Sequence, residues 1–284
     1  MTKGEQVGPQ DWQGERGLRW LRDMAGFEAM LQPLGEALMA RAALASGERV
    51  VDIGCGGGWT SRAAAAQVGG RGSVCGVDIS ALLLREAARR ATGIPNLTFV
   101  RADASVDAVP GAPFDRMISR LGVMFFVDPA AAFARLRRLL VPGGRLDWAV
   151  WGPKEDNPWM FGARAVTARH LELSPPDPGA PGPFTLTDRD RLAGLLAGAG
   201  FVDIEIVEHR HHVAVGGAAD PVAAADFAAG AFFFSDAIEA ADAATRAAIH
   251  EDLVAFYRDF MTADGLAVPA RAWLVRAVAR SGIS

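Results

Sequence analysis

The feature that most constrains this chain is a glycine-rich turn that follows a short apolar strand. Residues 49–53 read as a strand, residues 54–58 hold four glycines around one cysteine, and residues 60–68 read as a helix. A strand that enters such a turn lets the backbone approach a ligand closely, because glycine has no Cβ. We therefore expect an α/β fold that binds a ligand at this turn.

Short apolar runs continue to alternate with Ala-rich helical stretches after this turn. Further strands are predicted at residues 73–77, 97–100, 114–119 and 145–151. Ser80 is expected to cap a helix that runs to about residue 91, and a helix after Asp128-Pro129 is expected to end at the Pro-Gly-Gly of residues 142–144. Strands separated by helices predict a mostly parallel sheet with helices on both faces.

The second half of the chain is less regular. We expect a loop at residues 174–183, a helix at 188–199, a strand at 201–213, an Ala-rich helical block at 220–261 and a last strand at 272–279. Such a helical block before the last strand would lie over the carboxyl edge of the sheet, where open α/β sheets bind ligands. The amphipathic segment at residues 18–44 is expected either to pack on the sheet or to act as a lid.

This reading divides the chain into four parts. They are a helical segment or lid at 1–47, a core at 48–218, a helical cap at 219–267 and the last core strand at 268–284.

Composition excludes several classes of protein. The 284 residues are 50% hydrophobic and 22% charged, with a formal net charge of -4, which is typical of a soluble globular protein and gives no electrostatic case for binding nucleic acid. No apolar stretch approaches the roughly 18 residues of a membrane helix, and the first 20 residues lack the apolar region of a signal peptide. Two cysteines cannot build a disulfide framework, which fits a cytoplasmic protein. A small molecule is the expected partner, and the chain is expected to be a monomer or a homodimer.

Two ligand classes use a glycine-rich turn of this kind. A dinucleotide fingerprint needs a glycine at the sixth position, and counted from Gly54 that position is Trp59. This disfavours a nicotinamide-dependent oxidoreductase, which we keep as an alternative. The pattern present is Asp-x-Gly-x-Gly-x-Gly, from Asp52 to Gly58.

That pattern resembles motif I of the class I S-adenosylmethionine-dependent methyltransferases. Further sequence motifs of the family follow in the same order along the chain. They are residues 77–79 (Val-Asp-Ile), residues 101–104 (Arg-Ala-Asp-Ala) and residues 140–144 (Leu-Val-Pro-Gly-Gly). The resemblance implies a Rossmann-like, seven-stranded, mostly parallel sheet with helices on both faces. It also implies S-adenosyl-L-methionine as cofactor and S-adenosyl-L-homocysteine as product.

The resemblance extends beyond the cofactor core. Residues 119–129, 157–159, 181–184 and 272–275 are similar to a bacterial subgroup that resembles the ubiquinone and menaquinone C-methyltransferases. It implies transfer of a methyl group, by in-line displacement, to carbon, oxygen or nitrogen of a small apolar or aromatic metabolite. The alternative within the same resemblance is a protein that binds the cofactor without catalysis.

The family's cofactor residues map onto this chain one by one. Asp78 is expected at the ribose hydroxyls, Ile79 against the adenine, Asp103 at the adenine amino group and Thr60 at the methionine carboxylate. For both aspartates the alternative role is that of a helix cap or a turn carboxylate. The full set of expected cofactor-binding residues is Trp20, Asp52, Gly54, Gly56, Thr60, Asp78, Ile79, Asp103, Ala104, Ser119 and Arg120.

Aromatic side chains are candidates for an apolar acceptor pocket, with core packing as the alternative for each. They are Phe125, Trp151, Trp159, Phe233 and Tyr257. Arg120 is a candidate for holding an anionic group during catalysis. His209 and His211 share one face of a strand and are candidates for a general base, with His212 and His170 as alternatives between which the sequence does not choose. No carboxylate or cysteine stands at ligand spacing from them, so no metal site is expected.

Overall fold

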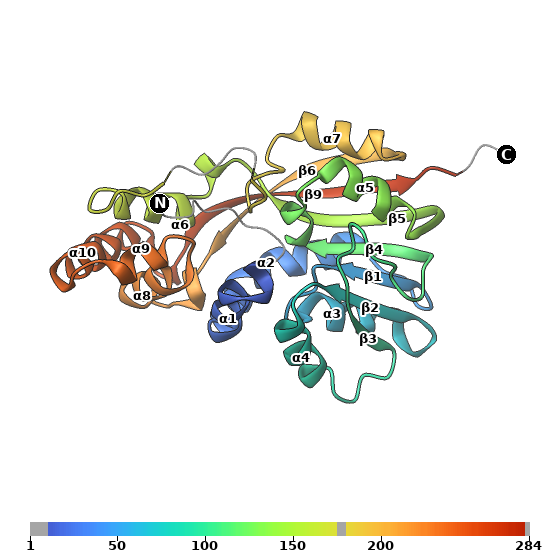
Figure 1. Ribbon diagram of the computed structural model, residues 1–284, viewed down its shortest axis with the longest axis horizontal. Coiled ribbons are helices and arrows are strands. Elements are labelled where there is room, and N and C mark those ends of the chain that lie inside the picture. Colours follow the sequence, from blue (N-terminus) through green and yellow to red (C-terminus); the bar gives the residue numbers. More distant parts are fainter. Residues whose placement is uncertain (1–10, 175–179, 282–284) are drawn as a thin grey trace.

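A computed structural model describes residues 11–174 and 180–281 of the chain. Its main sheet has seven strands in the order β3-β2-β1-β4-β5-β9-β6, of which the first five are parallel (Figure 1). β9 runs antiparallel to both β5 and β6. The strands are β1 (Arg49–Ile53), β2 (Ser73–Asp78), β3 (Leu97–Arg101), β4 (Phe114–Arg120), β5 (Leu140–Trp151), β6 (Phe201–Val213) and β9 (Val268–Ala279). The predicted seven-stranded, mostly parallel sheet is confirmed.

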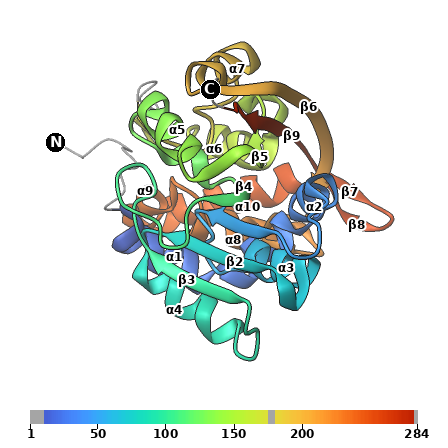
Figure 2. The ribbon, with the colours of Figure 1, turned by 90° about the vertical axis from the view of Figure 1, so that its right-hand side faces the viewer.

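Helices cover both faces of this sheet. The α-helices are α1 (Glu15–Arg22), α2 (Met24–Ala42), α3 (Trp59–Val68), α4 (Ala81–Arg90), α5 (Pro129–Arg137), α6 (Pro158–Thr167), α7 (Arg189–Gly198), α8 (Pro221–Ala231), α9 (Ser235–Ala240) and α10 (Ala243–Arg258). Short 3-10 turns occupy η1 (Asp11–Gln13), η2 (Gly69–Arg71), η3 (Gly122–Phe125), η4 (Lys154–Asp156) and η5 (Val215–Gly217). Figure 2 shows α2 and α3 on one side of the sheet and α5 and α7 on the other.

Two adjacent residues of β5 show how the faces are used. Trp148 packs against Phe133 of α5, with ring centroids 5.0 Å apart. Asp147 points to the opposite face, because successive side chains of a strand alternate. There the fully buried Asp147 pairs with Arg116 at 2.8 Å and with Arg276 at 2.8 Å.

The same arginines hold the end of α2. Arg116 donates to the Ala42 carbonyl and Arg276 donates to the Arg41 carbonyl, so they occupy acceptors that the last turn of a helix leaves free. This cluster anchors the carboxyl end of α2 on that face of the sheet.

One helix is shorter than the sequence predicts. The expected cap is present, since the Asp128 carboxylate accepts from the Ala131 amide at 3.0 Å. However, α5 ends at Arg137, and Leu140 already pairs with Phe114 in the sheet. The prediction that the helix continues to residues 142–144 is wrong. The apolar residues after Arg137 have a spacing that also fits a helix, but they form the start of β5 and pair with β4 instead.

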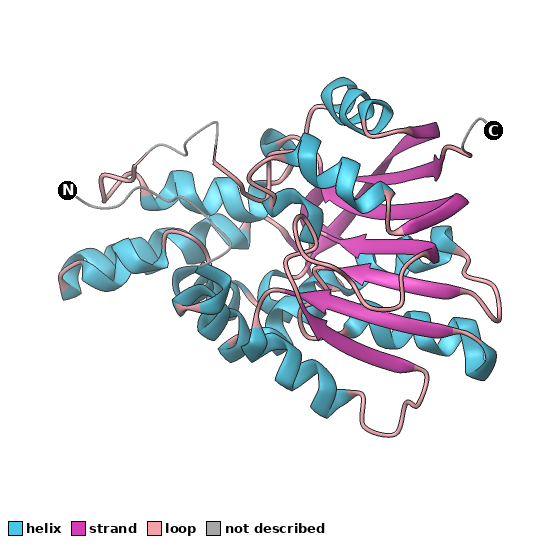
Figure 3. Cartoon of the chain, turned by 45° about the vertical axis from the view of Figure 1, so that its right-hand side comes forward, coloured by secondary structure: helices cyan, strands magenta, loops and turns pink. Residues whose placement is uncertain are grey.

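A helical layer lies over the carboxyl ends of the parallel strands. It contains α8, α9 and α10, and a short hairpin of β7 (Met261–Thr262) and β8 (Gly265–Leu266) returns the chain to β9. The amino-terminal amphipathic stretch forms two helices, α1 and α2, which meet at Asp23. Figures 1 and 3 show α1 and the inserted helices beyond the same end of the sheet.

Candidate active site

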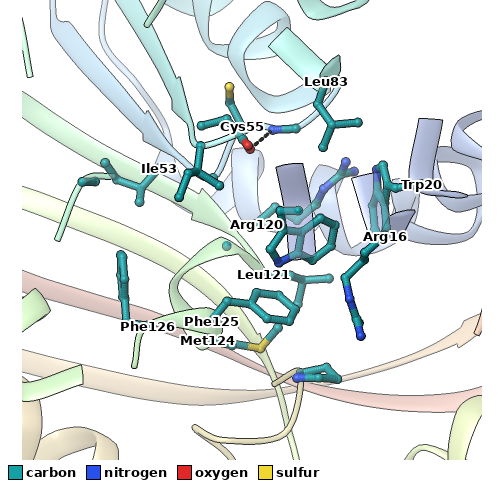
Figure 4. A pocket seen from close by; sticks show the side chains of 18 of the residues that line it. Arg16, Trp20, Ile53, Cys55, Leu83, Arg120, Leu121, Met124, Phe125 and Phe126 are labelled. Carbon is teal, nitrogen blue, oxygen red and sulfur yellow. Dashed lines mark hydrogen bonds between the residues drawn. The ribbon is translucent and has the colours of Figure 1, made fainter. Parts of the chain in front are cut away.

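A cavity of about 490 Å³ lies at the carboxyl ends of β1 to β4. Its walls come from the loops after these strands, from α1 and α2, and from the segment that joins α8 to α9. Figure 4 shows Trp20 and Arg16 on one side of this cavity and Ile53 and Phe126 on the other. The cavity is therefore built from core, amino-terminal and inserted elements together.

The glycine-rich turn forms the floor of the cavity. The amides of Gly54 and Cys55 both donate to the Val77 carbonyl, at 2.8 and 3.1 Å, and this folds the turn against the end of β2. A Cβ added to Gly54 would lie 2.7 Å from Gly122 Cα, so the two loops touch backbone to backbone. Gly56 has a φ of +52° and open space on its Cβ side. A ligand can approach this backbone without meeting a side chain.

Asp52 supports the turn from below and does not line the cavity. Its Oδ2 accepts from the hydroxyls of Thr60 and Ser61, each at 2.6 Å, while its buried Oδ1 has no partner among the described residues. Burial raises the pKa of Asp52 to about 6, against the opposing effect of the two hydroxyls. Thr60 lines the cavity with its hydroxyl committed to this carboxylate.

Asp78 lines the cavity where β2 ends. Its Oδ2 accepts from the Gly56 amide and its Oδ1 from the Ser80 amide, both at 2.8 Å. Burial raises the pKa of Asp78, and these backbone bonds act in the opposite direction. Each carboxylate oxygen has a further lone pair, so Asp78 can brace the turn and still accept hydrogen bonds from a ligand.

Asp103 also combines a turn with a place on the cavity wall. Its Oδ1 accepts from the amide of Ser105 at 2.9 Å and from the hydroxyl of Ser105 at 2.6 Å. Ile79 and Ala104 line the same wall. Asp78, Ile79, Asp103 and Ala104 thus line the part of the cavity where the family resemblance predicts ribose and adenine.

Two residues at the end of β4 play different parts. Ser119 is buried away from the cavity, and its hydroxyl donates to the Ile53 carbonyl at 2.7 Å, which ties β4 to the turn. Arg120 lines the cavity with its guanidinium 5.1 Å above the Trp59 ring, and its Nη1 donates to the Leu31 carbonyl at 3.3 Å. Burial lowers the pKa of Arg120 to about 10, so the side chain stays charged at neutral pH. Trp59 therefore serves as a platform for Arg120.

The amino-terminal segment contributes aromatic rings to the cavity. Trp20 stacks on Phe27 with centroids 4.0 Å apart and planes 7° apart. Trp12 meets Trp20 edge-on at 5.6 Å and Phe125 at 5.2 Å, so it bridges α1 and the loop after β4. Trp12 was not among the predicted site residues, because a residue ahead of the first predicted helix gives no periodic signal.

Four of the five predicted acceptor residues line the cavity, namely Phe125, Trp151, Trp159 and Phe233. The rings of Trp151 and Trp159 are 5.0 Å apart and form a continuous wall. Tyr257 lies outside the lining. It is fully buried, its hydroxyl donates to the Trp159 carbonyl at 2.9 Å, and its pKa is raised by burial. Its position supports the wall from behind.

His209 and His211 also lie outside the lining. The His211 ring stacks on Trp151 at 6.0 Å with planes 9° apart, and His209 stacks on His211 at 4.9 Å. Burial lowers the pKa of His211 to about 4 and also lowers that of His209. Both imidazoles are therefore neutral at pH 7. They are separated from the cavity by Trp151, on which His211 stacks, and His209 stacks on His211 in turn.

Three arginines of α1 contact the inserted segment. Arg19 forms an ion pair with Asp236, Arg22 Nη2 donates to the Gly230 carbonyl at 2.7 Å, and the Arg16 guanidinium lies 4.5 Å from the centre of the Phe233 ring. Arg16 and Arg19 also line the cavity. Their spacing of three residues reads as a solvated helix face in sequence, so their role at the site could not be predicted.

Comparison with known proteins places these features in a family. Residues 50–144 match the family model described as a methyltransferase domain. Aklanonic acid methyltransferase DauC of Streptomyces sp. (strain C5) is 36% identical over 126 residues, which are 44% of this chain and 57% of that protein. A 2-phytyl-1,4-naphthoquinone methyltransferase of Thermosynechococcus vestitus is 38% identical over 104 residues, 36% of this chain and 45% of that protein. The chain thus spans about half the length of these curated relatives.

The fold has solved counterparts as well. The YcgJ protein of Bacillus subtilis superposes with a TM-score of 0.55 at 16% identity, over 87% of this chain and 98% of that one. Fold and site together define a Rossmann-like α/β protein with a cavity at the carboxyl edge of its sheet. Residues 50–144 thus form a methyltransferase domain, and together with the named relatives this match supports the predicted class I S-adenosylmethionine-dependent methyltransferase.

Two further observations concern the described residues alone. None of their helices combines the length and the apolar character needed to cross a membrane. Within the same residues, no group of three or more histidine, cysteine, aspartate and glutamate side chains is placed to hold a metal ion.

Proposed function

We propose that the protein transfers a methyl group from S-adenosylmethionine to a small apolar or aromatic acceptor. The observation that carries this proposal is the continuity of the cavity. One end has the glycine-rich turn, Asp78 and Asp103, and the other has the aromatic wall of Trp151 and Trp159. Two ligands bound in one cavity can react directly, because proximity and orientation supply much of the rate enhancement.

The residues present fit the cofactor. Asp78 offers acceptor capacity at the ribose position, Asp103 and Ala104 offer polar groups at the adenine position, and Gly56 leaves its Cβ side open. When bound, the cofactor supplies a methyl group on a sulfonium, which is an intrinsically reactive donor. The protein then has to orient the two ligands and exclude water.

The helical segments at 1–47 and 219–267 support the exclusion of water. We assign them as a lid and a cap over the core at 48–218 and 268–284. α1 and the segment between α8 and α9 both line the cavity, and they are joined through Arg19 and Asp236. A ligand held beneath both elements is shielded from solvent on the side away from the sheet.

The lining of the cavity contains no histidine or tyrosine side chain that could deprotonate an acceptor. The chain has five histidines and one tyrosine, all within the described residues, and none of them lines the cavity. An acceptor that arrives already ionised, such as a carboxylate, an acidic phenol or a stabilised enolate, needs no such base. The relative named for aklanonic acid supports an acidic acceptor, and the relative named for a naphthoquinone supports an aromatic one.

The rival functions account for fewer observations. A nicotinamide-binding turn needs a glycine where Trp59 stands, and Trp59 carries Arg120 on its ring. A protein that binds the cofactor without catalysis has no use for an acceptor space, yet the aromatic end of the cavity is open.

The test is methyl transfer from S-adenosylmethionine labelled in its methyl group. Hydroxynaphthoates, naphthoquinols and acidic phenols are offered together with neutral aromatic alcohols of matched size. Label in the acidic aromatic acceptors supports the proposal. Label in the neutral alcohols alone would contradict the acidic acceptor, and label in none of these compounds would contradict the proposed acceptor class.

A further inference from the structure

A carboxylate that has no assigned role lies beside the glycine-rich turn. Glu28 of α2 lines the cavity, and a Cβ added to Gly57 would lie 3.0 Å from its Oε1. Its other oxygen, Oε2, is held by Arg90 Nη1 at 2.5 Å, so the carboxylate is fixed from the side of α4. Oε1 thus faces the turn while Oε2 is anchored. The side chain is only 18% exposed.

A guanidinium lies in the same part of the cavity. Arg120 is held between the Trp59 ring and the backbone of α2, since a Cβ added to Gly35 would lie 2.7 Å from that ring and 3.0 Å from Arg120 Nη1. Arg120 is therefore held on two sides and is partly buried. Its charge and the charge of Glu28 attract each other across the floor of the cavity.

The Glu28 carboxylate and the Arg120 guanidinium do not form an ion pair with each other. Among the described residues, Glu28 pairs with Arg90 instead. Glu28 is thus compensated through Oε2. Arg120, by contrast, contacts no carboxylate among the described residues, only the Leu31 carbonyl and the Trp59 ring. A partly buried guanidinium without a counter-ion is costly unless a ligand supplies one. A ligand that carries one positive and one negative group on neighbouring atoms matches this arrangement.

We propose that Glu28 and Arg120 together bind the amino-acid end of the cofactor. Glu28 receives the α-ammonium group and Arg120 receives the α-carboxylate. The inference rests on the proposed function, because it takes S-adenosylmethionine as the ligand. It assigns Glu28, on the amino-terminal segment, a binding role that the glycine-rich motif does not contain.

The assignment predicts how three nucleosides are distinguished. S-adenosylmethionine has both charged groups, decarboxylated S-adenosylmethionine keeps the ammonium alone, and 5′-methylthioadenosine has neither. Glu28→Gln should weaken the first two by roughly 10- to 100-fold, the range expected for one hydrogen bond to a charged group. It should leave 5′-methylthioadenosine within about twofold, because that nucleoside does not reach Glu28.

Arg120→Gln should give a different pattern. It should weaken S-adenosylmethionine by a similar factor and leave both decarboxylated S-adenosylmethionine and 5′-methylthioadenosine nearly unchanged. Glu36→Gln is the matched control, since Glu36 is an exposed carboxylate on the same helix outside the cavity. This control should change none of the three affinities.

Calorimetric titration of the three nucleosides into wild type and variants decides between the outcomes. An unchanged affinity of Glu28→Gln for S-adenosylmethionine overturns the assignment of Glu28. An equal loss for all three nucleosides also overturns it, because the variant would then act through the shape of the turn. Failure of wild type to bind any of the three overturns the proposed function itself, and the inference with it.

Discussion

At the scale of single residues, Asp78 is the residue on which the proposed cofactor site depends most. Its carboxylate already braces the turn through the amides of Gly56 and Ser80, and the proposed function adds a ligand to the same oxygens. Asp78→Ala should weaken S-adenosylmethionine by about 10- to 100-fold, since it removes hydrogen bonds to a charged acceptor. Asp78→Asn, which keeps one acceptor oxygen, should lose less. Calorimetry checks both variants, and an unchanged affinity for Asp78→Ala would remove Asp78 from the cofactor site.

Asp52 makes a prediction about pH. Its pKa rises from 3.8 to about 6 on folding, so the folded state favours the protonated form. This contribution to stability is fully present below about pH 4 and is lost as the pH rises through 6. The loss amounts to about 3 kcal/mol at 1.36 kcal/mol per pKa unit.

Asp52→Asn should abolish this dependence, because its amide oxygen can still accept from Thr60 and Ser61. Denaturant unfolding of both proteins at pH 5 and at pH 8 checks the prediction. The variant should gain stability relative to wild type as the pH rises. Parallel pH profiles of the two proteins would contradict a raised pKa at Asp52.

A substitution of His211 tests whether the reaction proceeds without a histidine as general base. The His211 ring packs behind Trp151, and burial keeps it neutral. His211→Gln should therefore leave kcat within about threefold once an acceptor is known. The pH dependence of kcat/KM should follow the pKa of whichever acceptor is used. A loss of 100-fold or more, with the fold intact, would restore His211 as a general base.

At the scale of elements, α1 and the inserted segment are joined by an ion pair beside the cavity that both of them line. Asp236→Asn removes the carboxylate that pairs with Arg19. An exposed ion pair contributes at most about 1 kcal/mol, so trypsin should cleave α1 about two- to fivefold faster in the variant. Glu251→Gln, an exposed change on α10, is the control. Equal cleavage rates for Asp236→Asn and wild type would show that this ion pair does not hold α1 in place.

The elements also show what sequence can predict and where it stops. β6 begins and ends where its alternating residues predict, and Ser80 caps α4 as expected. The end of α5 was misplaced because an apolar run after Arg137 suits either a helix or a buried strand, and pairing with β4 decides between them.

The same division applies to the site. The family resemblance, not the strand pattern, singled out Gly54, Asp78 and Asp103 as cofactor residues. All three line the cavity, because they lie at or just after the ends of β1, β2 and β3, which adjoin in the sheet. Glu28 and Trp12 were not predictable, since only the packing of α1 and α2 across the strand ends brings them to the cavity. His209 and His211 share a face as predicted, but that face packs behind Trp151, which sequence spacing cannot show.

At the scale of the whole molecule, one buried charge cluster connects the sheet to the amino-terminal helix α2. Asp147 holds Arg116 and Arg276, and these hold the carboxyl end of α2, while the other end of α2 carries Phe27 and Glu28 to the cavity. A rigid α2 positions both the aromatic and the charged parts of the cavity from a single anchor. Fold stability and site geometry thus depend on the same helix.

The most direct test of the central claim is calorimetric titration of the wild-type protein with S-adenosylmethionine and, separately, with NADPH. The account predicts one saturable site for S-adenosylmethionine and no measurable heat with NADPH. Binding of NADPH alone would contradict it. The glycine-rich turn would then have to hold a dinucleotide in spite of Trp59.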